Sequence, residues 1–557
     1  MADRIAQESV AHGPRFFRAG WDRWTLGALA IAALVVAPLI AVALIALFPT
    51  ENIWPHLVST VLPRYLANSL GLVICVGGAT AVIGTGCAWL TTMCAFPGRR
   101  WLEPLLFAPL AVPAYIGAYA LVDLLEYAGP VQGALRELFG WRSARDYWFP
   151  EIRSFWAAAT VLSLGYYPYV YLLARAAFRE QSVSALEVSR ALGQGPWGSF
   201  WRVAVPLARP AIFIGAAVAA METLNDFGAV DFFAVQTLTT GIFSIWLEAY
   251  NAGGAAQIAC VMLALILGLM LVERRSRAKR RYHNMSKRYR PVERARLGPV
   301  ARWLAFLACL APFALGFLLP VGVMLSHAMD DPAVWQRAAL WRAGLNTVWL
   351  SLLTAVIAVA AGLFMVYGAR NSASRLPRLL APVTQVGYAA PGAVIAVGVL
   401  IPFAALDHRV ADGIEALTGH DPGLILTGST AAVVFAYLVR FFAVAQGAME
   451  SAMGRVTPSM DMAARSLGRT RGGALRDVHL PMIRSSILAA GMVVFVDTAK
   501  ELPATLILRP FNFDTLATHT HMQAKSEQLS AAAPSALAIV ALGLLPVVLL
   551  GLQKRQG

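Results

Sequence analysis

The sequence has few charged residues and few cysteines, and each shortage excludes a class of protein. Charged side chains make up 14% of the 557 residues and hydrophobic ones 58%, whereas soluble proteins are about 25% charged. The five cysteines include no CxxC pair, which argues against a disulfide framework and against a thiolate metal site. The mean hydropathy of +0.61 predicts instead a helical protein that crosses a membrane many times.

The sequence also lacks a nucleotide-binding motif and a cleavable signal peptide. No GxxxxGK[ST] stretch occurs, so the chain has no P-loop, and we expect no cofactor in it. The apolar run 24–47 is longer than a signal-peptide core and is typical of a membrane anchor. The net charge of +15 would suit nucleic acid, but the basic residues lie between apolar runs, as membrane orientation requires. We therefore expect a lipid environment and no nucleic-acid partner.

The apolar runs predict an all-α membrane protein with about twelve transmembrane helices in two pseudo-symmetric halves of six. The expected spans are 24–47, 69–90, 104–125, 154–177, 210–233, 255–272, 304–324, 347–367, 379–404, 424–444, 485–508 and 531–550. The expected organisation is an N-terminal tail at 1–20, a first half at 21–273, a basic linker at 274–299 and a second half at 300–557. Asn68-Ser69 and Pro113 recur 278 residues later as Asn346-Thr347 and Pro391, which favours a parallel repeat.

The distribution of basic residues predicts the orientation in the membrane. With the N-terminus in the cytoplasm, 35 of the 46 Lys and Arg residues fall in or beside cytoplasmic segments. Positive charge concentrates on the cytoplasmic side of membrane proteins. We therefore expect a multi-pass protein of the bacterial inner membrane with both termini in the cytoplasm and a basic linker facing anionic headgroups.

A polar loop occurs twice, 275 residues apart, between apolar runs that face the cytoplasm in this orientation. Each copy has a short amphipathic stretch that ends at a glycine, and a proline follows thirteen positions later. Glycine commonly ends helices, and proline commonly begins them. The candidate coupling residues are Glu187, Arg190, Gly193 and Pro206 in the first copy and Asp461, Arg465, Gly468 and Pro481 in the second.

This loop resembles the EAA motif of permease subunits in binding-protein-dependent ABC importers, and the resemblance covers both halves of the chain. It implies that each loop docks on a cytoplasmic ATPase subunit, expected to be a homodimer that binds the ATP. It also implies a periplasmic solute-binding protein as the second partner. One departure is Met462, which stands where the motif has Glu, with Asp461 one position earlier. If that acid orients the docking helix, the two halves are expected to couple unequally.

Charged residues inside two apolar runs are the candidate translocation path. Offset 275 aligns Glu222 with Asp497 and Asp226 with Glu501, and Asn225 and Lys500 break the symmetry. Each pair of acids is four residues apart and would share one face of a continuous helix. Charge inside a span costs about 2.5–3.5 kcal/mol, so such groups face the bundle interior or water. Two interpretations stay open: the acids line a path or gate for a cation, or they form ion pairs, notably Lys500 with Asp497.

The sequence around these acids is similar to that of ferric-iron-type permeases. The similar stretches are METLNDFG at 221–228 and KELPATL at 500–506. The resemblance implies ferric iron as the solute, and hard Fe(III) suits carboxylate oxygens. Thiamine or another small solute remains an alternative, as does a proton-coupled secondary transporter using Glu222, Asp226 and Glu501. The chain is not expected to be an enzyme. Two weaker candidates are a metal site at His519 and His521 and phenolate donors among Tyr166, Tyr167 and Tyr169, which are otherwise packing aromatics.

Overall fold

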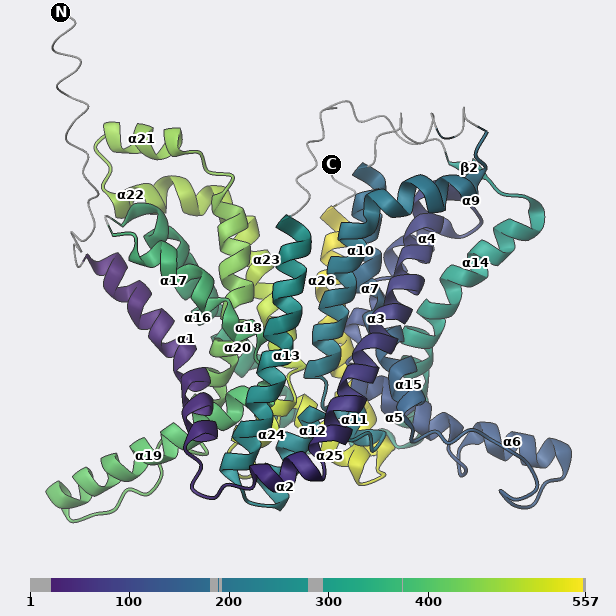
Figure 1. Cartoon of the computed structure of the whole chain (residues 1–557), viewed down its shortest axis with the longest axis horizontal. Coiled ribbons are helices and arrows are strands. Elements are labelled where there is room, and N and C mark those ends of the chain that lie inside the picture. Colours follow the sequence, from purple (N-terminus) through teal and green to yellow (C-terminus); the bar gives the residue numbers. More distant parts are fainter. Residues whose placement is uncertain (1–21, 181–188, 190–192, 279–293, 373, 554–557) are drawn as a thin grey trace, which may run out of the picture.

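The computed structural model describes residues 22–180, 189, 193–278, 294–372 and 374–553, and these form a bundle of long helices (Figure 1). The elements of the first half are α1 (Arg23–Leu47), α2 (Trp54–Ser59), α3 (Leu62–Met93), β1 (Cys94–Ala95), α4 (Arg99–Leu105), η1 (Ala108–Ala111), α5 (Ala114–Leu125), α6 (Pro130–Phe139), α7 (Phe155–Glu180), α9 (Pro196–Ser199), η2 (Phe200–Ala204), α10 (Val205–Asn225), α11 (Gly228–Phe232), α12 (Leu238–Phe243), η3 (Ser244–Glu248) and α13 (Ala252–Ala278).

The second half follows the same order. Its elements are β2 (Ala295–Arg296), α14 (Pro299–Phe313), η4 (Ala314–Leu318), α15 (Leu319–Asp330), η5 (Pro332–Gln336), α16 (Ala338–Asn371), α17 (Leu376–Thr384), α18 (Val386–Ala389), α19 (Gly392–Thr418), α20 (Thr430–Met453), α21 (Pro458–Ser466), α22 (Arg471–Ala474), η6 (Leu475–His479), α23 (Leu480–Ala499), α24 (Pro503–Leu508), α25 (Leu516–Lys525) and α26 (Leu529–Gln553).

The predicted all-α membrane architecture is confirmed, although several of the expected spans are broken, two of them at matched prolines. Within the described residues, ten helices are long and apolar enough to cross a membrane. The expected third span is bent by 94° between η1 and α5, and the described apolar part of the last helix is Leu529–Leu545. The breaks in the third and ninth spans fall at the matched prolines, Pro113 and Pro391, which precede α5 and α19 with extended ψ angles of 142° and 149°.

The two halves repeat at the level of single hydrogen bonds. Asn68 Nδ2 donates to the Gln236 carbonyl at 2.8 Å, and Asn346 Nδ2 donates to the Asp514 carbonyl at 2.9 Å. The neighbouring hydroxyls, of Ser69 and Thr347, accept from the first backbone N–H of α12 and of α25. The Asn-Ser/Thr match in the sequence therefore marks one structural device, which in each half ties a long helix to a short one.

The two halves of the sequence do not form separate domains, because helices of each half pack against the other. Helix α1 packs against α16, α17 and α19 of the second half, with the Trp24 ring 5.2 Å from the Tyr367 ring. In the reverse direction α14 packs against α3 and α4, and α15 against α5. Figure 1 shows α1 among the second-half helices and α14 beside the first-half ones. Each half therefore lends its first helix to the other half, and the predicted boundaries at 273 and 300 describe the chain rather than the packing.

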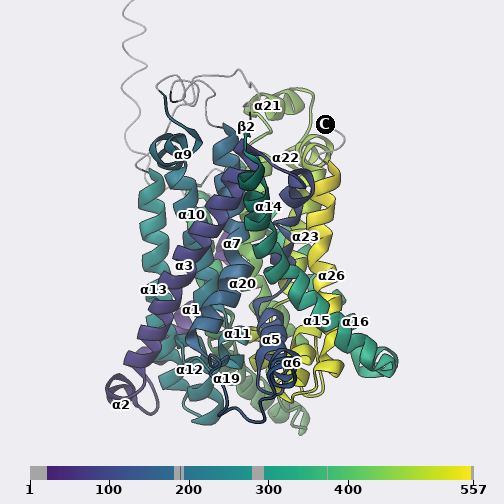
Figure 2. The ribbon, with the colours of Figure 1, turned by 90° about the vertical axis from the view of Figure 1, so that its right-hand side faces the viewer.

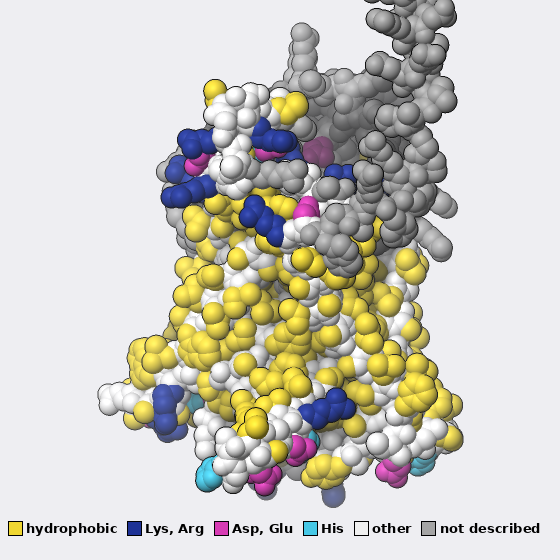
Figure 3. All heavy atoms as spheres, turned by 90° about the vertical axis from the view of Figure 1, so that its left-hand side faces the viewer, with side chains coloured by type: hydrophobic (Ala, Val, Ile, Leu, Met, Phe, Trp, Pro, Cys, Tyr) yellow, Lys and Arg dark blue, Asp and Glu magenta, His cyan; other side chains and the backbone are white. Residues whose placement is uncertain are grey.

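The bundle has two chemically different ends. We call them the α21 end, where α9, α21 and α22 lie, and the α25 end, where α2, α24 and α25 lie (Figure 1). At the α25 end, α6 and the last part of α19 project sideways, and Figure 2 shows long helices such as α3, α13 and α26 running between the two ends. On the face drawn in Figure 3, hydrophobic side chains form a band between ends that carry the charged side chains. Such a band is expected of a protein that spans a bilayer.

Candidate translocation path and coupling loops

The two spans that carry the acids end before their expected boundaries. Helix α10 ends at Asn225, and the Asp226 carboxylate accepts hydrogen bonds from the N–H groups of Ala229 and Val230, at 3.0 and 3.2 Å. Helix α23 ends at Ala499, and the Glu501 carboxylate accepts from Ala504 and Thr505, at 3.0 and 3.1 Å. The two acids thus bind the free N–H groups that open the short helices α11 and α24.

These breaks correct the prediction that each pair of acids shares one face of a continuous helix. The spans expected at 210–233 and 485–508 end at Asn225 and Ala499. The i,i+4 geometry therefore does not apply, because a capping side chain replaces the next turn of the helix. The aligned acids Asp226 and Glu501 nevertheless both cap the short helix that follows them. The predicted symmetry of the acids is therefore present as two equivalent helix caps.

All six predicted path residues line one cavity of about 130 Å³. They are Glu222, Asn225, Asp226, Asp497, Lys500 and Glu501. Arg440 from α20 and the tyrosines Tyr166 and Tyr169 from α7 also line it. Four acids and two bases give the lining a formal charge of −2. The arrangement can accept a cation more readily than an anion.

Ion pairs inside this cavity differ between the two halves. In the second half Lys500 Nζ lies 2.9 Å from Asp497 Oδ1, and Arg440 lies 2.9 Å from Glu501 Oε1. In the first half the Tyr166 hydroxyl donates to Asp226 at 3.4 Å. The ion-pair interpretation therefore holds for the second-half acids, and all four acids line one cavity, whereas their role as a path or gate for a cation stays a prediction.

Arg440 is the residue that sequence reasoning misplaced. It belongs to the apolar helix α20, in the cavity, although the count of 35 basic residues in or beside cytoplasmic segments, which supported the predicted orientation, included it. At offset 275 the first half has Gly165 at this position. An arginine inside an apolar run was the available signal, since such a charge faces the bundle interior and finds a partner.

The tyrosines considered as oxygen donors or as packing aromatics, Tyr166, Tyr167 and Tyr169, have different surroundings. Tyr166 and Tyr169 line the cavity, whereas Tyr167 is fully buried in an apolar cluster between α3 and α7. Two of the three rings are therefore placed to offer oxygens to a solute, and one is a packing aromatic.

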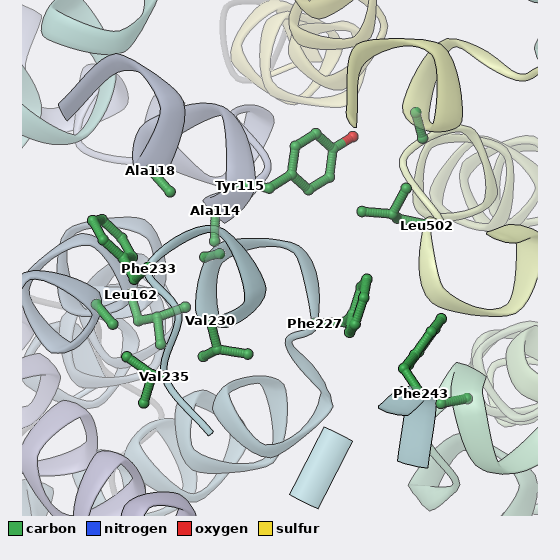
Figure 4. Packing of buried hydrophobic residues seen from close by; sticks show 14 of the residues in the cluster. Ala114, Tyr115, Ala118, Leu162, Phe227, Val230, Phe233, Val235, Phe243 and Leu502 are labelled. Carbon is green, nitrogen blue, oxygen red and sulfur yellow. The ribbon is translucent and has the colours of Figure 1, made fainter. Parts of the chain in front are cut away.

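A group of apolar side chains lines the cavity beside the acids. Phe227 and Leu502, which align at offset 275, both line it next to Tyr115 (Figure 4). A Cβ atom on Gly228 would lie 2.8 Å from Tyr115 Cβ and 2.9 Å from Leu502 Cδ2, so the three segments are in tight contact. Phe243 stacks on Phe227, with ring centroids 3.8 Å apart. Matching residues of the two halves thus meet at one apolar plug.

The structure describes more residues of the second coupling loop than of the first. Glu187 and Arg190 of the first loop lie outside the described residues. Gly193 has a φ of 76°, and Pro206 lies in the first turn of α10. In the second loop Asp461 and Arg465 lie on α21. Helix α21 ends at Ser466, two residues before Gly468, which has a φ of 82°, and Pro481 lies in the first turn of α23. The predicted glycine stop is thus present in the second loop. The predicted proline start is not, because Pro481 lies inside a continuous helical stretch, Gly472–Ala499, that begins nine residues before it.

The Asp461 carboxylate holds the helix α21 against the base of α23. Asp461 Oδ1 lies 3.2 Å from Nε2 of His479, a fully buried residue just before α23. Met462, which replaces the motif glutamate, is 61% exposed, and Leu467 is 83% exposed. The acid one position early therefore points into the protein and Met462 points out, and at the position equivalent to His479 the first half has Ala204.

The two histidines considered as metal ligands lie on the helix α25, not in a loop, and their side chains already have partners. His519 Nδ1 lies 3.1 Å from Ser535 Oγ, and His521 Nδ1 lies 2.7 Å from the Tyr119 hydroxyl. Among the described residues no group of three or more His, Cys, Asp and Glu side chains is placed to hold a metal. His521 instead joins the second half to α5 and α11 of the first, since Asp231 and Lys525 lie beside it.

We expect this histidine to make the protein less stable in acid. Burial lowers the pKa of His521 from 6.5 to about 4, although the Asp231 carboxylate opposes the shift. The unfolded chain therefore binds the proton at a higher pH than the folded one, so stability is complete above pH 6.5 and falls as the pH drops toward 4. The melting temperature measured in detergent between pH 7 and 4 should decline, and His521→Gln should flatten the decline. The exposed residue His420 provides the control His420→Gln, and equal slopes in all three proteins would contradict this role.

Comparisons with known proteins agree with this geometry. The family model described as "Binding-protein-dependent transport system inner membrane component" matches residues 80–282 and 358–556. The chain is 26% identical to the Fe(3+)-transport system permease protein FbpB 2 of Haemophilus influenzae, over 87% of this chain and 89% of that protein. It is 22% identical to the ferric transport system permease protein FbpB of Actinobacillus pleuropneumoniae, over 87% and 72%. A third relative, the molybdenum transport system permease protein ModB of Escherichia coli K12, is 28% identical and covers 33% of this chain. The chain therefore belongs to the inner-membrane components of binding-protein-dependent transport systems, with two copies of the family unit fused in one multi-pass protein of the inner membrane.

Proposed function

We propose that this chain is the membrane pathway of an ATP-driven importer for ferric iron. The cavity between α10 and α23 carries the proposal, because carboxylate and phenol oxygens surround it and its formal charge is negative. Fe(III) is a hard cation that prefers oxygen ligands. Relatives named as ferric transport permeases match nearly the whole chain. The ion pairs of Lys500 and Arg440 reduce the negative charge, which suits a path that must release its solute.

The α21 end is proposed to face the cytoplasm, with both termini on that side. Two equivalent ATPase subunits would dock on the two loops, and the apolar side chains of Met462 and Leu467 are exposed where the second would bind. ATP would be bound by that homodimeric partner and not by this chain. A periplasmic binding protein carrying the iron would dock at the α25 end.

The proposed cycle transmits force from the loops to the plug. Closure of the ATPase pair would move α21, and the contact between Asp461 and His479 would pass that motion to α23. Helix α23 ends at the cavity, one residue before Lys500. Its displacement relative to α10 would separate Phe227 from Leu502 and admit the cation from the α25 end to the acids. ATP hydrolysis would then reset the bundle.

Uptake measurements in cells that lack this chain test the proposal. Complementation should restore uptake of radiolabelled ferric iron, and labelled thiamine and molybdate measured in parallel should stay at background. A protonophore added while cellular ATP is maintained should leave iron uptake unchanged, whereas a proton-coupled carrier would stop. Restored thiamine uptake without iron uptake would overturn the assignment of the solute and keep the permease architecture.

The same cells test the role of the first-half acids. The double variant Glu222→Gln, Asp226→Asn removes two of the four negative charges of the cavity and should reduce iron uptake strongly at an unchanged amount of protein in the membrane. The variant Asp123→Asn is the control, because Asp123 pairs with His327 outside the cavity. Normal iron uptake in the double variant would show that the acids serve the structure only.

A further inference from the structure

A second cavity, of about 350 Å³, lies at the α21 end, away from the proposed path. It opens between the hairpin that joins α3 to α4 and the segment that leads into α14. Its lining residues are Ala95, Phe96, Gly98, Arg99, Arg100, Trp101 and Arg294. The parallel pairing of β1 with β2, Cys94 with Ala295 and Ala95 with Arg296, fixes the two sides relative to each other. The cavity is therefore formed jointly by the first half and the end of the linker.

Positive charge around this cavity exceeds the negative charge available to it. The Glu103 carboxylate is contacted by three guanidinium groups, those of Arg99, Arg175 and Arg179. Arg100 and Arg294 form no ion pair with any residue that the structure describes. Among the described residues, three arginines thus share the Glu103 carboxylate, and two further arginines line the cavity without an ion-pair partner. Like charges at this density repel one another unless an anion lies between them.

The surroundings place the cavity at the level of the lipid headgroups. Trp101 lines it and is 75% exposed, and Trp303 on the adjacent α14 is 52% exposed. Exposed tryptophans are enriched where the hydrocarbon core meets the headgroups. The arginine planes there match a phosphate group, which guanidinium binds with two parallel hydrogen bonds.

We propose that this cavity binds a phosphate oxyanion, in the membrane the headgroup of an anionic phospholipid. The bound phosphate would contact Arg100 of the hairpin and Arg294 of the linker and so join the two. Phe96 and Leu297, which flank the cavity, pack in the same apolar cluster as Phe200, just before α10. The site therefore anchors the linker to the apolar cluster that packs against Phe200, next to the first coupling loop.

Lipid binding to the purified full chain tests this site. In nanodiscs of phosphatidylcholine, addition of phosphatidylglycerol should raise the melting temperature, and inorganic phosphate at matched ionic strength forms a second arm. The double variant Arg100→Gln, Arg294→Gln should weaken binding of phosphatidylglycerol by about fivefold for each arginine removed. A response to phosphatidylglycerol, with or without a response to phosphate, supports the site with a lipid headgroup as its ligand. A response to phosphate alone supports an oxyanion site but overturns the headgroup as its ligand.

The equivalent hairpin of the second half supplies the matched control. Arg375 and Arg378 are exposed at the same end of the bundle, and neither lines this cavity. Arg375→Gln with Arg378→Gln should leave the response unchanged. The proposal is overturned if both double variants respond like the wild type, or if they lose the response equally, because the effect would then come from general surface charge. It is also overturned if phosphatidylcholine stabilises as well as phosphatidylglycerol. Iron uptake is not part of this readout, so its result is independent of the proposed function.

Discussion

Replacing Arg440 by methionine is expected to destabilise the protein by about 3–5 kcal/mol, the range found when one partner of a buried ion pair is removed. The Glu501 side chain is 1% exposed and lies 2.9 Å from the Arg440 guanidinium. The carboxylate is held in place by two backbone N–H groups of α24, so it stays buried when its cation is lost. A Cβ on Gly392 would come within 2.5 Å of both charged groups, which shows that α19 closes over the pair and limits access for water.

Thermal or chemical unfolding of the purified protein in detergent measures this loss. The double variant Arg440→Met, Glu501→Gln should regain much of the stability, because the amide oxygen of glutamine still accepts from the Ala504 N–H without a buried charge. Arg337→Met is the matched control, since the pair of Arg337 with Asp331 is exposed and such pairs contribute about 0–1 kcal/mol. If Arg440→Met is no less stable than the control variant, the ion pair contributes little to the stability of the protein.

The predictions from sequence succeeded where the signal was one of composition or spacing. Apolar runs located the membrane helices, because burial in lipid requires long stretches without charge. The 275-residue and 278-residue offsets found the repeat, and the same matches mark the hydrogen bonds of Asn68 and Asn346. Charges inside apolar runs located the cavity, since a charge in a span faces the bundle interior.

The predictions that the structure corrects concern features that do not depend on hydropathy. Helix α10 stops at Asn225 because the Asp226 side chain caps the next helix, and an aspartate has the same hydropathy whether it caps a helix or lies within one. The exchange of first helices between the halves depends on which apolar surfaces fit together, and all these surfaces are apolar. Arg440 was counted among the cytoplasmic basic residues because a count of charges in or beside loops ignores depth in the membrane.

Replacing Gly468 by valine is expected to abolish iron uptake while the protein still folds and inserts. Gly468 has a φ of 82°, and a Cβ there would meet no other atom within 4 Å, so the cost is in the backbone and not in packing. For an ordinary residue the left-handed region costs about 1–2 kcal/mol, and a β-branched residue is disfavoured further. This cost is small compared with the stability of a bundle of this size, but it falls on the turn that sets the direction of α21. Relaxation of the turn would move Asp461 away from His479, and motion of the ATPase would no longer reach α23.

The asparagine variant separates backbone strain from any other effect of a side chain at this position. Asparagine adopts the left-handed conformation more readily than other residues do, so Gly468→Asn should retain most of the uptake although it adds a larger polar group. Gly472→Val controls for a β-branched residue nearby, since Gly472 has no positive φ and open space at its Cβ. ATP hydrolysis by the reconstituted complex, measured with and without the binding protein, should continue in Gly468→Val but lose its response to that protein. If Gly468→Val transports iron normally, the direction of α21 does not govern coupling, and transmission must run through the first loop alone.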